Sequence, residues 1–169
     1  TGATTLSGTG SLTGKTLSKG ANTITWTASD GTNTSTSLTF TKTVIDNEAP
    51  LVSTVGNQYK GTDADNCYYT VNGTEFDATY SDNCSVDSVS YTINGGASVA
   101  ATTLNGTEIA PGINTIVWTV SDGVNSKSST FRVTVTDDTP PIINTPFLYY
   151  KNQRSYLHLQ FDITHTNSC

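Results

Sequence analysis

Methionine is absent from this chain of 169 residues, and basic residues, histidine and cysteine are scarce. Eight Lys and Arg against 14 Asp and Glu leave a net charge of -6, which disfavours binding to nucleic acid or to an anionic membrane surface. No apolar run approaches the ~20 residues of a membrane span, so we expect no membrane insertion. Helix-forming runs are missing too, whereas Thr, Ser, Asn and Gly are abundant. Because these residues favour strands and turns, the composition predicts an all-β protein.

Only three cysteines are present, Cys67, Cys84 and Cys169. A zinc site would need further Cys or His nearby, but His158 and His165 lie far along the chain. Cys67 and Cys84 each follow an Asp-Asn pair. We therefore expect a disulfide between Cys67 and Cys84. If a further unit starts near the end of the sequence, Cys169 would have its partner beyond that end.

The strongest positive signal is an internal repeat. Residues 22–33, NTITWTASDGTN, match residues 114–125, NTIVWTVSDGVN. After a shift of one residue the match continues to Pro50 and Pro141, which gives a period of 91 residues. This period is close to the size of one immunoglobulin-like β-sandwich.

The repeat divides the chain into three segments. Residues 1–50 match the C-terminal part of a unit, residues 51–141 form a complete unit, and residues 142–169 start a further repeat or form an atypical tail strand. Acidic segments that contain proline mark both boundaries. We therefore expect tandem immunoglobulin-like β-sandwich repeats with Pro-containing acidic linkers. The chain does not begin with Met, and we interpret it as a mature or excised fragment.

Alternating apolar residues locate the strands of the complete unit. The clearest hairpin joins residues 115–121 to residues 126–136 through a turn at residues 122–125. Its inward-facing residues are predicted to be Ile116, Trp118, Val120, Phe131, Val133 and Val135.

A second hairpin is predicted around the Asn72-Gly73 pair, a sequence typical of tight hairpin turns. It would join residues 68–71 to residues 76–80. A further strand is predicted at residues 86–93, where apolar residues again alternate.

The repeated hairpin, the aromatic residue that leads its final strand and the Asp-Asp-Thr-Pro-Pro boundary resemble HYR (hyalin-repeat) domains, as does the Ser-Asp-Asn-Cys segment at residues 81–84. The resemblance covers residues 1–141. It implies immunoglobulin-like extracellular modules, of the kind found in cell-surface adhesins of gliding bacteria. One departure is that the cysteine pair common in HYR units is replaced by Val-Ser-Thr at residues 52–54 and Ser-Ser-Thr at residues 128–130.

On this resemblance we expect a structural or adhesive segment of a secreted bacterial cell-surface protein, such as the stalk or filament-like adhesins of gliding motility. Its partners would be neighbouring repeats and a surface polysaccharide or another cell-surface protein. Ser88, in Asp87-Ser88-Val89, matches a pattern that resembles the O-glycosylation site of this bacterial group.

Two alternatives stay open. One is a carbohydrate-binding accessory module of a large secreted enzyme, for which the candidate residues are Tyr59, Tyr68, Tyr69 and Tyr80. The other is a subunit of an extracellular fibre. We expect no enzyme, because Asp30 and Asp122 occupy equivalent turns of separate repeats and neither histidine lies in a catalytic motif.

Calcium is the cofactor that the acidic boundaries indicate, because Ca²⁺ binds about six to eight carboxylate and carbonyl oxygens. Cadherins resemble this arrangement, with calcium between consecutive domains. The alternative is that these residues only start turns. The candidate ligands are Asp46, Asn47, Glu48, Asp63, Asp65 and Asp82 at the first junction, and Asp137 and Asp138 at the second.

Overall fold

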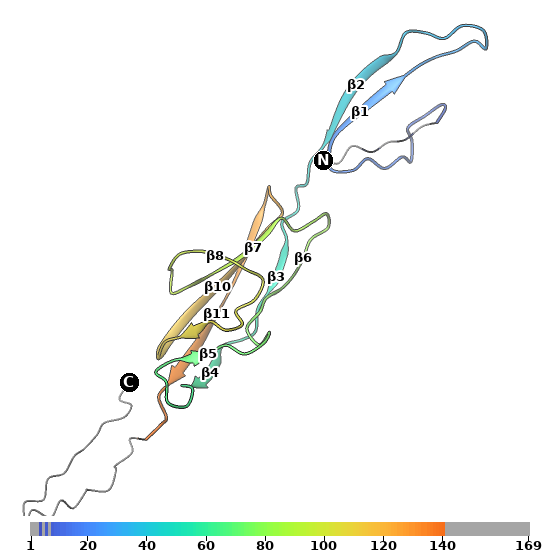
Figure 1. Cartoon of the computed structure of the whole chain (residues 1–169). Helices are drawn as coiled ribbons and strands as arrows, with labels where there is room; N and C mark the ends of the chain where they lie inside the picture. Colours follow the sequence, from blue (N-terminus) through green and yellow to red (C-terminus); the bar gives the residue numbers. More distant parts are fainter. Residues whose placement is uncertain (1–3, 5, 7, 141–169) are drawn as a thin grey trace, which may run out of the picture.

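The computed structural model describes residues 4, 6 and 8–140 of the chain (Figure 1). The predicted repeat start at residues 142–169, with Cys169, lies outside the described residues. The described part is all-β and contains no helix, as the composition predicts. Its strands are β1 (Gly20–Trp26), β2 (Leu38–Val44), β3 (Leu51–Ser53), β4 (Gln58–Gly61), β5 (Tyr69–Thr70), β6 (Thr79–Ser81), β7 (Ser88–Ile93), β8 (Val99–Ala100), β9 (Glu108–Ile109), β10 (Gly112–Ser121) and β11 (Ser126–Thr136).

The hairpin β10–β11 is the longest element of the central unit, a name used here for the segment from β3 to β11. Its strands pair along their length, with Ile116 opposite Phe131 and Ser121 opposite Ser126. Alternate residues point to opposite faces of a strand, so the predicted apolar residues lie together on one face of the hairpin. The six residues predicted to face inward, Ile116, Trp118, Val120, Phe131, Val133 and Val135, are all buried, which confirms the prediction.

The hairpin forms the centre of a five-stranded sheet with the order β4-β11-β10-β7-β8. β7 pairs antiparallel with β10, whereas β4 pairs parallel with β11. The predicted strand at residues 86–93 corresponds to β7. Two short antiparallel pairs, β3–β6 and β5–β9, complete the central unit. The arrangement is consistent with a β-sandwich.

The apolar core of the central unit forms around Trp118. Its indole Nε1 donates a hydrogen bond to the backbone oxygen of Phe76 at 3.0 Å, and its ring contacts Tyr91 at a centroid distance of 5.2 Å. Phe76 in turn contacts Phe131 at 5.8 Å. Because the indole N–H is satisfied inside the core, a large aromatic side chain is buried there without a lost hydrogen bond.

The hairpin predicted at Asn72-Gly73 is not formed. β5 pairs with β9 and β6 pairs with β3, so the strands on either side of the turn have different partners. The intervening residues instead bring Phe76 into the core and place the Glu75 carboxylate where it accepts hydrogen bonds from Asn72 N and Tyr69 Oη. Burial of Phe76 therefore outweighs the local preference of Asn-Gly for a hairpin turn.

The hairpin β1–β2 repeats the geometry of β10–β11. Gly20 pairs with Val44, and Ile24 with Phe40, in the register that Gly112 and Ile116 adopt in the second hairpin. A buried asparagine recurs at the same place: Asn22 Nδ2 donates to Ser18 O and Gly20 O, and Asn114 Nδ2 donates to Ala110 O and Gly112 O. The repeat seen in the sequence is thus a repeat of local structure (Figure 1).

Two leucines of the central unit differ sharply in burial, which predicts different losses of stability when each is replaced by alanine. Leu104 is 0% exposed and packs in the core, whereas Leu51 is 71% exposed. We expect Leu104→Ala to lower the free energy of unfolding by about 2–5 kcal/mol through lost burial and a residual cavity. Leu51→Ala, the matched control, should change it by less than ~0.5 kcal/mol. Urea unfolding followed by circular dichroism measures both, and similar losses would contradict the proposed core.

Candidate functional site

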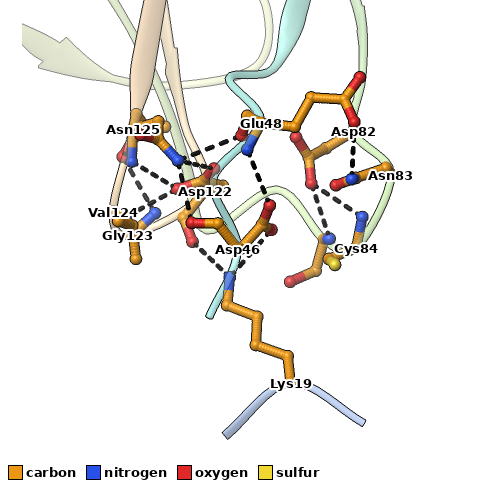
Figure 2. Close-up of polar contacts among 12 residues, drawn as sticks. Lys19, Asp46, Glu48, Asp82, Asn83, Cys84, Asp122, Gly123, Val124 and Asn125 are labelled. Carbon is orange, nitrogen blue, oxygen red and sulfur yellow. Dashed lines mark hydrogen bonds and ion pairs between the residues drawn. The ribbon is translucent and has the colours of Figure 1, made fainter. Parts of the chain in front are cut away.

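Three carboxylates gather at one end of the central unit, where the segment between β2 and β3 meets two loops. Asp46 belongs to that connecting segment, Asp82 to the loop after β6, and Asp122 to the turn between β10 and β11. One oxygen from each lies within 4.8 Å of the others. Figure 2 shows this acidic cluster, as we call the three residues, with its neighbours.

Asp122 is fixed by the turn in which it lies. Its Oδ1 accepts hydrogen bonds from Val124 N and Asn125 N, both at 2.6 Å. These backbone bonds, the one from Asn125 foremost, lower the pKa of Asp122 despite its burial, and the charge of Lys19 acts in the same direction. The amide of Asn125 also donates to Asp122 Oδ2 at 3.1 Å and to Glu48 O at 3.1 Å. The turn is therefore tied to the connecting segment.

Asp46 is buried among donors from three parts of the chain. Its Oδ1 accepts from Glu48 N at 3.2 Å, and its Oδ2 lies 3.3 Å from Lys19 Nζ. Burial opposes the ionised form of Asp46, but hydrogen bonds from Glu48, the Cys84 thiol and Lys19 outweigh it and lower the pKa of Asp46. Asp46 is thus held as a carboxylate.

Only one of the two carboxylate oxygens of Asp82 has hydrogen-bond partners among the described residues. Its Oδ2 accepts hydrogen bonds from Cys84 N at 2.9 Å and Ser85 N at 3.1 Å. Its Oδ1 is buried and has no hydrogen-bond partner among the described residues. A buried carboxylate oxygen without a donor is costly, so this atom is suited to accept a cation.

The negative charge of the acidic cluster raises the pKa values of two neighbouring side chains, Cys84 and Lys19. The Cys84 thiol donates to Asp46, and this hydrogen bond, together with partial desolvation of the sulfur, raises the pKa of Cys84. Lys19, from the segment before β1, extends between Asp46 Oδ2 and Asp122 O, each 3.3 Å from Nζ (Figure 2). Burial favours neutral Lys19, but the bond to Asp46 and the charges of Asp46 and Asp122 outweigh it, so the pKa of Lys19 is raised.

The acidic cluster has the chemistry of a site for a hard divalent cation. It combines carboxylate oxygens with the nearby carbonyl oxygens of Asp46, Glu48 and Asp122, which are the ligand types that Ca²⁺ prefers. The unpartnered Asp82 Oδ1 fits the same use. Asp46 and Asp82 were predicted as ligands from the sequence, whereas Asp122 was interpreted as a turn residue.

The remaining predicted calcium ligands do not join the acidic cluster. Glu48 uses its Oε2 to accept a hydrogen bond from Asn83 Nδ2 at 2.8 Å, and Asn47 is exposed. Asp63 and Asp65 lie at the other end of the central unit, because the adjacent Thr62 N donates to Thr136 O at the end of β11. The grouping of Asp63 and Asp65 with Asp46 was therefore wrong.

Two further predicted ligands follow β11. Asp137 Oδ1 accepts from Thr139 N at 3.1 Å, the same turn that Asp46 makes with Glu48. The Asp138 carboxylate packs on Gly61, where an added Cβ would lie 2.9 Å from Asp138 Oδ1. Both residues thus lie at the end of the central unit opposite the acidic cluster.

The disulfide predicted between Cys67 and Cys84 is not formed, since Cys84 is a free, exposed cysteine. Cys84 contacts Asp46 beside the Asp122 turn. Cys67 lies in the turn from Asp63 to Tyr68, near the far end of β11. The 11 residues of β11 separate these ends by about 30 Å, far beyond the reach of a disulfide.

The four candidate sugar-binding tyrosines are spread over different elements. Tyr59 is exposed on β4, and Tyr69 is engaged by Glu75 in the network that also pairs Lys60 with Glu75 at 2.6 Å. Tyr68 precedes β5 and is half-buried. Tyr80 on β6 lines a cavity of about 410 Å³ between β3, β6 and Lys127. Ser88, the predicted glycosylation site, is exposed at the start of β7.

No family model matches the chain, and no curated protein matches it either. The resemblance to HYR domains therefore rests on the residues of this sequence alone. In the part of the chain that the structure describes, no helix has the length and apolar character needed to cross a membrane.

The lowered pKa values of Asp46 and Asp122 predict acid sensitivity. Their ionised forms stabilise the fold above the ordinary aspartate pKa of ~4, and this contribution is lost as the pH falls through the lower folded-state pKa values. We expect the urea midpoint, measured in chelator, to fall steeply below about pH 4. Asp122→Asn should weaken this dependence, while Glu108→Gln, which removes an exposed carboxylate on β9, should retain it. Equal pH profiles for both variants would contradict the assignment.

Proposed function

We propose that the chain is part of a tandem array of immunoglobulin-like units that serves as a structural or adhesive stalk of a secreted bacterial cell-surface protein, with no enzymatic role. The observation that carries the proposal is the duplicated hairpin. β1–β2 and β10–β11 share register, the buried asparagine and the Asp-Gly turn, in which Asp30 accepts from Thr32 N and Asn33 N as Asp122 does from Val124 N and Asn125 N.

The strand order of the central unit supports the immunoglobulin-like assignment. In that fold the last two strands lie side by side in one sheet, together with the third strand of the domain. Here β4 pairs parallel with β11, and β10 lies between β11 and β7. The size of the repeat fits the same fold.

The connection between units supports a rod. The segment from Asp46 to Pro50 is fixed to the central unit by Asn125 and by the Asp46 turn, and Pro50 is buried. In Figure 1 the hairpin β1–β2 extends beyond the end of the central unit that holds this segment. Units that contact only their neighbours in sequence build long, quasi-linear proteins, which suits a stalk. The HYR resemblance adds the cell surface of gliding bacteria as the setting.

Calcium is the cofactor proposed for the junction, with Asp46, Asp82 and Asp122 as its carboxylate ligands. A cation bound there would join the connecting segment to two loops of the central unit. It would also satisfy the buried Asp82 Oδ1. The junction would then be stiffer with calcium than without it, because the ion bridges parts of the chain that are otherwise held by hydrogen bonds.

Thermal unfolding with calcium and with excess chelator tests this site. Saturating calcium should raise the midpoint by several degrees, equivalent to about 1–2 kcal/mol for a domain of this size. Asp82→Asn should abolish the rise. Asp65→Asn, a matched change at the other end of the central unit, should keep it. A rise that survives Asp82→Asn, or no rise in the wild type, would refute calcium binding at the acidic cluster.

The cavity beside Tyr80 favours carbohydrate binding as a second candidate function. Its volume of about 410 Å³ falls in the range of small-ligand pockets, and it combines an aromatic ring with Lys127 and the exposed Leu51. A sugar would stack its apolar face on the aromatic ring and bond its hydroxyls to neighbouring polar groups.

Affinity electrophoresis through gels that contain soluble polysaccharides tests the second candidate. Retardation by one polysaccharide should be lost in Tyr80→Ala and kept in Tyr59→Ala, because Tyr59 is exposed outside the cavity. The expected loss is about tenfold in affinity, as for removal of one central aromatic contact. Absence of retardation across the panel, or equal loss in both variants, would exclude this function for the cavity.

A further inference from the structure

Lys19 is the residue by which the segment before β1 enters the acidic cluster of the central unit. Its ammonium lies 3.3 Å from Asp46 Oδ2 and 3.3 Å from the backbone oxygen of Asp122 (Figure 2). The Asp46 side chain is 1% exposed, whereas that of Lys19 is 33% exposed. The cationic end of a partly exposed, flexible side chain is therefore inserted among anions that are largely removed from solvent.

The ammonium does not balance the charge around it. One positive charge faces the carboxylates of Asp46, Asp82 and Asp122, of which Asp46 and Asp122 have lowered pKa values. Asp82 Oδ1 stays buried and without a partner even with Lys19 in place. The acidic cluster thus already receives one cation from the chain and retains an unpaired buried oxygen, which is an independent sign that it is suited to a stronger cation.

We propose that the acidic cluster is a single cation site that the Lys19 ammonium and a divalent metal ion occupy in exclusion of each other. Lys19 contacts Asp46 and Asp122, which are two of the three residues whose carboxylate oxygens would bind the metal, so the ammonium and the metal would lie beside each other. The positive charges of the metal ion and of the Lys19 ammonium would repel each other strongly in this partly buried site, so binding of the metal expels the ammonium. Lys19 then acts as an internal competitor that sets the calcium affinity of this junction and releases its own contact when calcium binds.

The two repeated hairpins differ at the position of Lys19. Asn22 donates to Ser18 O as Asn114 donates to Ala110 O, which fixes the alignment of the two segments in space as well as in sequence. In that alignment Lys19 corresponds to Pro111. The segment that leads into β10 therefore has no lysine at the position from which Lys19 reaches the acidic cluster.

The inference rests on the proposed calcium site, and isothermal titration of calcium into three forms of the chain tests it. Lys19→Gln removes the competitor, and Lys42→Gln removes an equal charge from an exposed position on β2. We expect Lys19→Gln to tighten calcium binding about three- to tenfold, and Lys42→Gln to leave it within about twofold because its charge is screened. Lys42→Gln should keep the unfolding midpoint of the central unit in chelator, whereas Lys19→Gln should lower it, because the buried Asp46 carboxylate then loses its ion pair.

The displacement itself is visible by nuclear magnetic resonance of the lysine ammonium groups. Calcium should shift the Lys19 Nζ resonance toward that of a free lysine and leave Lys42 unchanged. Equal calcium affinity in all three forms, or an unchanged Lys19 resonance at saturation, would overturn the shared site while leaving the calcium site intact. No calcium binding by any form would instead overturn both, and calcium binding seen only in Lys19→Gln would support the competition in its strongest form.

Discussion

Pairing of β10 with β11 is the constraint on which the rest of the central unit depends. The hairpin buries Trp118 and five other bulky residues on one face, and its two outer edges accept β7 and β4. Its turn presents Asp122 and Asn125 at one end, and the far end of β11 leads to Asp137. A single long hairpin therefore fixes the core, the sheet order and the positions of Asp122 and Asp137 at its two ends. The acidic cluster exists because this turn points back toward the segment by which the chain enters the central unit.

Alternation of apolar residues in the sequence predicted the strands and hairpins that form between neighbouring segments of the chain. The β10–β11 hairpin, its buried face and β7 follow from alternation of apolar residues, and the duplicated hairpin follows from the repeat. Pairings between distant segments were not predictable in the same way. Asn72-Gly73 has the sequence of a hairpin turn, but burial of Phe76 under Trp118 sends the flanking strands to different partners.

The difference between local and long-range signals also explains why only part of the candidate site was predicted. Asp46 and Asp82 could be named from composition, but their grouping with Asp63 and Asp65 assumed that neighbours in sequence lie at the same end. A strand as long as β11, about 30 Å, carries the chain across the whole unit, so Asp63 and Cys67 lie at the opposite end from Asp46 and Cys84. The usable signal was the direction of the hairpin. The last strand, β11, leaves the central unit at the end opposite the one where the chain enters. The turn before β11 must therefore lie at the entry end, and this places Asp122 beside Asp46.

Charge is distributed unevenly over the described part of the chain, and it is concentrated at the acidic cluster. Charged residues are few, and the outer face of each hairpin carries hydroxyl pairs such as Thr25 with Thr39 and Thr119 with Ser128. Such faces are polar but nearly neutral, so they provide little electrostatic attraction to a neighbour lying alongside. The buried carboxylates of Asp46 and Asp122, by contrast, lie together where the segment between β2 and β3 meets the β10–β11 turn. Lys19, from the segment before β1, pairs with Asp46 there, so the electrostatic contacts of the acidic cluster join segments that follow one another along the chain.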